Sequence, residues 1–179
     1  MLSKRFFGIS FFYRTFVTKN ISYMDEKEKW MNEAIRLSEE NVRNGGGPFG
    51  AVVVKDGRLI ATGVNRVTAT CDPTAHAEIR AIRTACEALH TFDLTGCELY
   101  TSCEPCPMCL GAIYWAHIDR IYYGNTKDDA RVIGFDDSFI YDELERPACE
   151  RRLKIEPLMR DAAQKAFRMW EEKDDKVAY

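Results

Sequence analysis

The chain has 179 residues, of which 46% are hydrophobic and 30% are charged, and this balance excludes a disordered or fibrous protein. Its net charge of −3 is uneven: residues 1–23 carry four basic and no acidic side chains, which leaves −7 on residues 24–179. A polyanionic partner needs clustered Lys and Arg. The net negative charge of residues 24–179 therefore makes nucleic acid an unfavoured partner and favours a small molecule as the substrate.

Residues 1–23 differ in composition from the remainder, being aromatic, basic and free of acids. Their uncharged run is far too short to span a bilayer, so we expect no membrane association. Two interpretations stay open: an organellar targeting segment, or a start assigned too early, with Met24 as the true first residue. In both cases we expect the folded domain to comprise residues 24–179.

The first predicted element is a helix over residues 25–44. Trp30, Ala34 and Leu37 recur near helical spacing, followed by Asn41 and Val42, and the three glycines that follow end the helix.

Residues 49–65 predict a β-hairpin, with Asp56-Gly57 as the turn between two strands. Asp72-Pro73 is typical of a helix start, with Asp as N-cap and Pro in the first position. The apolar stripe of this second helix comprises Ile79, Ile82, Cys86 and Leu89.

Further along, the pattern predicts a strand over residues 98–101, a helix over residues 106–116 and a strand over residues 120–123. Residues 160–172 predict a terminal amphipathic helix whose apolar side must pack against something. Helices that alternate with strands indicate an α/β protein, with three α/β/α layers around a mixed central sheet.

Seven cysteines, an odd number, occur in a chain too long to need disulfides, and this favours a reducing, cytoplasmic location. Three of them, Cys103, Cys106 and Cys109, have the spacing of a metal or redox site. Cysteines three apart at a helix start place both sulfurs on one face, where the helix dipole favours thiolates. With His76 as a third ligand, Cys106 and Cys109 would leave one position open for water, as in a catalytic Zn²⁺ site.

Glu78 lies two residues beyond His76 and can reach that water without being a ligand. A carboxylate there can take the proton of the water and pass it to departing ammonia. The pattern H-x-E…P-C-x-x-C is typical of zinc-dependent nucleobase deaminases.

Other interpretations of the motif remain. Cys106 and Cys109 can form a redox pair, although the upstream His76 and Glu78 argue against it. Cys103 can act as a fourth ligand and close a purely structural zinc site. Glu78 can serve only as a charge at a helix start.

The chain resembles the bacterial guanine deaminases of the cytidine deaminase-like superfamily. The resemblance covers residues 25–179 and rests on GGPFGAVVVKDG, DPTAHAE, LYTSCEPCPMCLGAIYWA, GFDDSFIYDEL and the terminal Tyr179. It implies a cytidine deaminase-like fold and the zinc-dependent hydrolysis of guanine to xanthine and ammonia. It also implies a homodimer that exchanges C-terminal segments.

The resemblance further implies roles for four residues in substrate binding. Asn65 would hydrogen-bond the purine edge and Phe49 would stack on the base. Asp137 would accept hydrogen bonds from the guanine amino edge and help to move protons, and Tyr179 would close over the ligand. Each residue also has a structural alternative. Asn65 can be a turn residue and Phe49 a core aromatic. Asp137 can belong to an ordinary helix start, and Tyr179 can be part of a frayed terminus.

The sequence leaves two alternative functions open. One is another deaminase of the superfamily, acting on guanosine, cytosine or tRNA adenosine. The other is a structural zinc module that binds a partner through its C-terminal region, against which Glu78 and the open coordination position argue.

Overall fold

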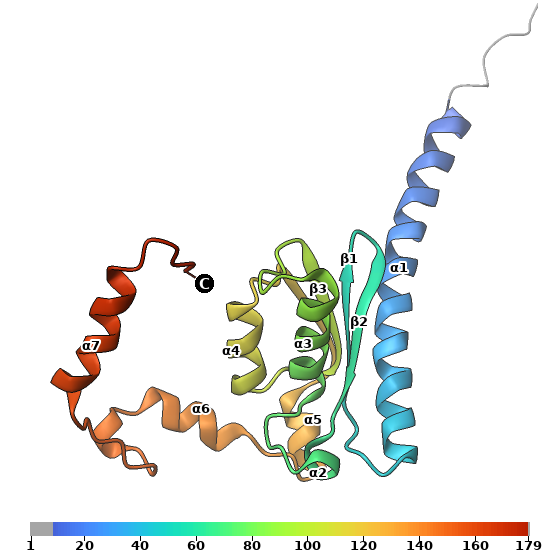
Figure 1. Ribbon diagram of the computed structural model, residues 1–179. Coiled ribbons are helices and arrows are strands. Elements are labelled where there is room, and N and C mark those ends of the chain that lie inside the picture. Colours follow the sequence, from blue (N-terminus) through green and yellow to red (C-terminus); the bar gives the residue numbers. More distant parts are fainter. Residues whose placement is uncertain (1–8, 179) are drawn as a thin grey trace, which may run out of the picture. The chain divides into compact units, whose positions relative to one another are not determined.

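A computed structural model describes the backbone of residues 9–178 and the side chains of residues 26–178 (Figure 1). The chain divides into two units, residues 1–127 and 128–179, and each is described by itself. The first unit contains α1 (Ile9–Arg43), β1 (Gly50–Lys55), β2 (Arg58–Val64), α2 (Val67–Thr70), α3 (Ala77–Leu89), β3 (Cys97–Cys103), α4 (Pro107–Trp115) and β4 (Arg120–Asn125).

The second unit is made of short helices without a strand among its described residues. They are α5 (Lys127–Val132), which begins on the last residue of the first unit, α6 (Ser138–Glu145), a 3-10 turn η1 (Ala148–Glu150) and α7 (Arg160–Glu171). The α7 helix matches the predicted terminal helix within one residue, yet none of its residues is buried.

The four strands form one mixed sheet in the order β2-β1-β3-β4. Strand β1 pairs antiparallel with both β2 and β3, and β3 pairs parallel with β4. Asp56 and Gly57 both adopt positive φ in the β1–β2 turn, which is the conformation that a two-residue hairpin needs. The predicted hairpin is therefore confirmed.

Successive side chains of β1 point to opposite faces of the sheet, so the hydrophobic core is divided between the two faces. Val52 and Val54 pack with Trp30 and Ala34 of α1, whereas Ala51 and its neighbours on that face pack against α3 and α4. Figure 1 shows α1 on one side of the strands and α3 and α4 on the other. The predicted α/β/α layering around a mixed sheet is confirmed.

Two glycines let the helices approach the sheet closely. A Cβ atom at Gly50 would lie 2.5 Å from the carbonyl oxygen of Ala34 in α1. One at Gly63 would lie 2.1 Å from the carbonyl oxygen of Ala77, in the first turn of α3. Gly63 therefore fixes how closely the start of α3 lies against β2.

The structure corrects where α1 begins. The helix extends back to Ile9 rather than beginning at residue 25, because no Gly or Pro interrupts residues 9–44. Residues 1–8, and the side chains of residues 9–25, lie outside what the structure describes, so the role of residues 1–23 stays a prediction. No described helix has both the length and the apolar character that crossing a membrane requires.

A second correction concerns α3, which begins at Ala77 rather than at Pro73. The Asp72 carboxylate accepts hydrogen bonds from the backbone N–H and the hydroxyl of Thr74, at 2.8 and 2.7 Å, and so closes a turn instead of capping the helix. The short α2 helix was not predicted. Strands β3 and β4 also run longer than predicted, because the pairing between them continues to Cys103 and Asn125.

We predict that Gly63→Ala lowers the free energy of unfolding by about 1–3 kcal/mol, because the new methyl group overpacks the β2–α3 contact. Gly111→Ala is the matched control: Gly111 lies inside α4 with nothing within 4 Å of its Cβ position. That control should gain up to about 1 kcal/mol from helix propensity. Urea unfolding at one protein concentration measures both, and equal stabilities would contradict the close-approach argument.

Candidate metal centre

Two helices begin side by side at one edge of the sheet. Strands β2 and β3 both run antiparallel to β1, so their carboxyl ends lie at the same edge. Helix α3 comes after β2 in the chain and α4 after β3. His76 immediately precedes α3 and Cys106 immediately precedes α4, both with extended backbone.

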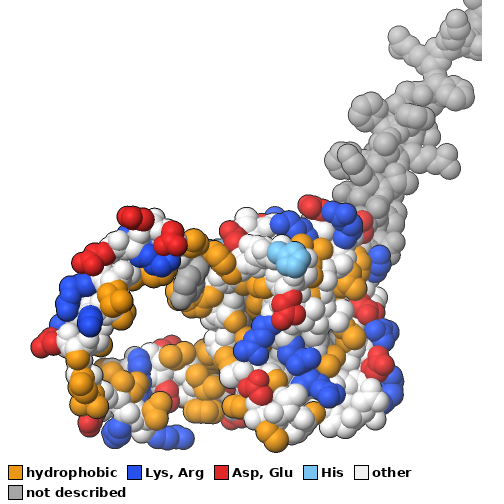
Figure 2. Space-filling model, viewed as in Figure 1, with side chains coloured by type: hydrophobic (Ala, Val, Ile, Leu, Met, Phe, Trp, Pro, Cys, Tyr) orange, Lys and Arg blue, Asp and Glu red, His pale blue; other side chains and the backbone are white. Residues whose placement is uncertain are grey.

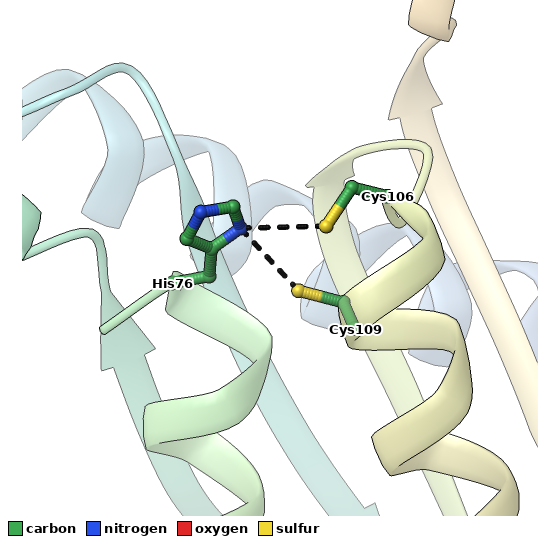
Figure 3. A group of neighbouring side chains, drawn as sticks. All are labelled: His76, Cys106 and Cys109. Carbon is green, nitrogen blue, oxygen red and sulfur yellow. Dashed lines mark hydrogen bonds between the residues drawn. The ribbon is translucent and has the colours of Figure 1, made fainter. Parts of the chain in front are cut away.

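Local sequence explains both positions. The N–H of Arg66 donates to the carbonyl oxygen of Ala75 at 2.9 Å, which ties the end of β2 to the residue before His76. Pro107 occupies the first turn of α4, where a missing N–H has no cost. Figure 3 shows His76 at the start of α3, facing Cys106 and Cys109 at the start of α4.

The three side chains have the separations of metal ligands. His76 Nδ1 lies 3.5 Å from the Sγ atoms of both Cys106 and Cys109, and all three atoms lie within 4.8 Å of one another. A tetrahedral zinc ion at its usual bond lengths separates nitrogen and sulfur ligands by about 3.6 Å. The donor set therefore fits zinc in both chemistry and spacing.

The two cysteines differ in their pKa values. Contact with the Cys109 side chain, together with His76 and against the effect of burial, lowers the pKa of Cys106 to about 4. The same contact and burial raise the pKa of Cys109. One sulfur is thus already a thiolate, the form that binds a metal, and a cation would favour the second.

Glu78 is the buried carboxyl of this site. Its Oε2 atom accepts a hydrogen bond from Cys109 Sγ at 3.5 Å, and the side chain is 6% exposed. Burial raises its pKa, and the nearby Cys106 thiolate raises it further. The carboxylate is adjacent to the group of three donors without belonging to it.

Cys103 lies outside the donor group. It is buried, and its thiol donates to the carbonyl oxygen of Thr126 at 3.6 Å. Among the residues that the structure describes, no fourth Cys, His, Asp or Glu joins His76, Cys106 and Cys109. The geometry therefore favours a three-ligand site over a closed one.

Asn65 and Phe49 lie next to each other beside the same edge. The N–H of Asn65 donates to the Phe49 carbonyl oxygen at 3.1 Å, and its Oδ1 accepts from the N–H of Val67 at 3.3 Å. Phe49 is half-buried against the core. Both residues thus fill the structural roles of a turn residue and a core aromatic, and their substrate contacts stay predictions.

Asp137 and Tyr179 have no described place at this site. Asp137 immediately precedes α6 in the second unit, and Asp136 accepts a hydrogen bond from the Ser138 N–H at 3.0 Å, as at an ordinary helix start. Tyr179 lies outside the described residues. The proposed roles of Asp137 and Tyr179 stay predictions.

The sequence pattern places Asn41 only on the helical stripe of α1. In the structure its buried carboxamide bonds two separate backbone segments near Asn65. No local pattern identifies such a residue, because one of its two partners, Asn65, lies 24 residues further along the chain.

Comparison with known proteins agrees with this geometry. Residues 24–125 match the family described as the cytidine and deoxycytidylate deaminase zinc-binding region. Guanine deaminase of Bacillus subtilis is 50% identical over 85% of this chain and 98% of its own length. The crystal structure of guanine deaminase from that organism superposes with a TM-score of 0.82, over the same shares of the two chains. A tRNA-specific adenosine deaminase of Aquifex aeolicus is 36% identical over 73% of this chain and 83% of its own length.

The matched region contains all three metal donors and Glu78, and the similarity to the Bacillus protein extends well beyond it. The chain belongs to the cytidine and deoxycytidylate deaminase family of zinc-binding proteins.

Proposed function

We propose that this protein hydrolyses guanine to xanthine and ammonia, using zinc held by His76, Cys106 and Cys109. The observation that carries the proposal is the three-donor group with a buried carboxylate beside it. Guanine is favoured over a tRNA adenosine because the Bacillus guanine deaminase is 50% identical over 85% of this chain, whereas the tRNA-specific enzyme of Aquifex aeolicus is 36% identical over 73% of it.

Glu78 moves the protons of this reaction. Zinc, when bound, lowers the pKa of a coordinated water so that a nucleophile is available near neutral pH. Water adds to the ring carbon that bears the 2-amino group, and the C–N bond to that group breaks. Glu78 accepts one proton of the water and passes it to the ring nitrogen. It then takes the proton of the new C–OH group and passes it to the amino group, which leaves as ammonia while the C–O bond becomes the carbonyl of xanthine. Its raised pKa suits a group that must both accept and donate.

Phe49 and Asn65 form the base pocket in this proposal. Gly47 separates them: a Cβ atom there would lie 3.3 Å from Asn65 Oδ1 and 3.5 Å from the Phe49 ring. Phe49 stacks on the purine, and the Asn65 carboxamide hydrogen-bonds its edge. A base that leaves this buried amide unpaired is penalised, and this penalty sets the specificity.

The substrate is a small nucleobase rather than a polynucleotide. Figure 2 shows acidic and basic side chains alternating along the exposed side of α1. Arg36 pairs there with Glu33 and Glu40, at 2.8 and 2.7 Å. Along residues 26–43, whose side chains the structure describes, this mixed charge offers no stripe of unpaired cations for a phosphate backbone.

The C-terminal unit completes the proposal. Asp137 would accept hydrogen bonds from the guanine amino group, and Tyr179 would cover the bound base, within a homodimer that exchanges these segments. The homodimer is supported by apolar side chains that are exposed on the second unit: Leu153, Ile155, Leu158, Phe167 and Trp170. Such surface is typical of a protein interface. A reducing compartment such as the cytoplasm suits the seven free cysteines.

Glu78→Gln should keep zinc and fold but lower kcat for guanine by about 100-fold or more, because the amide cannot transfer a proton. Ammonia release and metal content measure the two properties. Glu87→Gln is the matched control, since it makes the same change on the exposed side of the same helix. Near-normal turnover by Glu78→Gln would remove Glu78 from the mechanism.

A substrate panel tests the choice of base. We expect the ratio kcat/KM to be highest for guanine among guanine, guanosine, adenine, cytosine, cytidine and a tRNA anticodon stem-loop, as measured by ammonia release. A higher ratio for cytosine or for the stem-loop would contradict the guanine assignment while leaving zinc chemistry intact. Release from none of them would contradict the enzyme itself and favour a structural zinc module.

A further inference from the structure

A buried carboxamide in the last turns of α1 bridges two backbone segments. Asn41 is 4% exposed, and its Nδ2 atom donates two hydrogen bonds of 2.8 Å, to the carbonyl oxygens of Gly47 and Asn65. Both protons of the amide are therefore used on carbonyl groups from separate parts of the chain. A buried amide with both donors satisfied orders its partners rather than merely filling space.

These two carbonyls belong to the segments that carry the proposed base pocket. Gly47 is two residues before Phe49, and Asn65 provides the amide for the purine edge. Asn65 is also tied to Phe49 directly, through its N–H and the Phe49 carbonyl oxygen at 3.1 Å. Asn41 thus holds both sides of the pocket from the direction of α1.

The loop is fixed from β3 as well. Ser102 Oγ accepts a hydrogen bond from the Gly50 N–H at 3.0 Å and donates to the Pro48 carbonyl oxygen at 3.5 Å. Since β3 anchors residues 48–50 and the Asn65 N–H binds the Phe49 carbonyl oxygen, Asn41 supplies the tie between the earlier part of the loop, at Gly47, and Asn65.

Gly46 packs directly on the Asn41 amide. A Cβ atom at Gly46 would lie 2.4 Å from Asn41 Nδ2, whereas the Gly46 backbone itself is not in the left-handed region. An alanine at position 46 would therefore displace the amide without straining its own backbone. The site offers two independent ways to break the same bridge.

We propose that Asn41 is a positioning residue for substrate binding, which holds the loop that carries Phe49 in place beside Asn65. This inference rests on the proposed function, because it assumes that those two residues contact the base. Neither of its two hydrogen bonds goes to a metal donor or to Glu78. Asn41 therefore acts on the binding of the base and not on proton transfer.

The test compares Asn41→Ala and Gly46→Ala with Asn44→Ala, the same deletion at an exposed position next to the helix end. We expect the first two to raise KM for guanine by about ten-fold, with kcat within about three-fold of the parent, since pocket geometry and not chemistry is disturbed. Asn44→Ala should leave both constants unchanged. Zinc content should stay the same in all three.

A merely structural role gives a different result. Loss of folded enzyme lowers apparent kcat and leaves KM unchanged, and that outcome in both variants would overturn the proposal. Should Asn41→Ala fail to fold, Gly46→Ala decides alone: a parental KM in that variant overturns the proposal.

A double-mutant cycle identifies the residue through which Asn41 acts. In an Asn65→Ala background, Asn41→Ala should raise KM by less than about two-fold further, because the amide that it positions is gone. A full additional ten-fold effect would show that Asn41 does not act through Asn65. If the parent protein turns over another base in the panel and not guanine, the guanine assignment fails, and the same KM comparison made with that base still decides the role of Asn41.

Discussion

The close approach of α3 and α4 at the carboxyl edge of the sheet is the constraint on which the site depends. The residue before each helix, His76 or Cys106, supplies a metal donor, and the first turns add Cys109 and Glu78. Thiolates and carboxylates at helix starts are favoured by the helix dipole, which offsets part of the cost of burying them. The β-α-β connectivity brings two such starts together, because strands that run in the same direction end at the same edge.

This arrangement separates two tasks between different parts of the first unit. The metal donors and Glu78 come from α3 and α4, and they supply chemistry that is shared by deaminases acting on quite different substrates. The proposed base pocket comes from the loop before β1 and from the end of β2, where Phe49 and Asn65 lie. In this proposal a change in that second region would alter which base is bound without disturbing the metal, and Asn41 acts on the region from α1.

Much of the fold and of the metal site could be predicted because the signals are local. The Asp56-Gly57 turn and the spacing of Cys106 and Cys109 each encode their geometry within a few residues. The start of α3 could not be placed, because Asp72 bonds Thr74 in a turn that has the same sequence signature as a helix cap. The role of Asn41 depends on a hydrogen bond to Asn65, which lies 24 residues further along the chain, so no local pattern reveals it. Contacts of Asp137 with substrate depend on how chain segments assemble, which the pattern of one helix start cannot specify.

The number of sulfur ligands on the metal tests the central claim most directly, because three protein ligands make a catalytic site and four make a closed one. X-ray absorption at the zinc edge of the purified protein measures it. We expect two sulfur neighbours at about 2.3 Å and two lighter neighbours at about 2.0–2.1 Å, with the same spectrum for Cys103→Ser. A third sulfur neighbour that disappears in Cys103→Ser would contradict it.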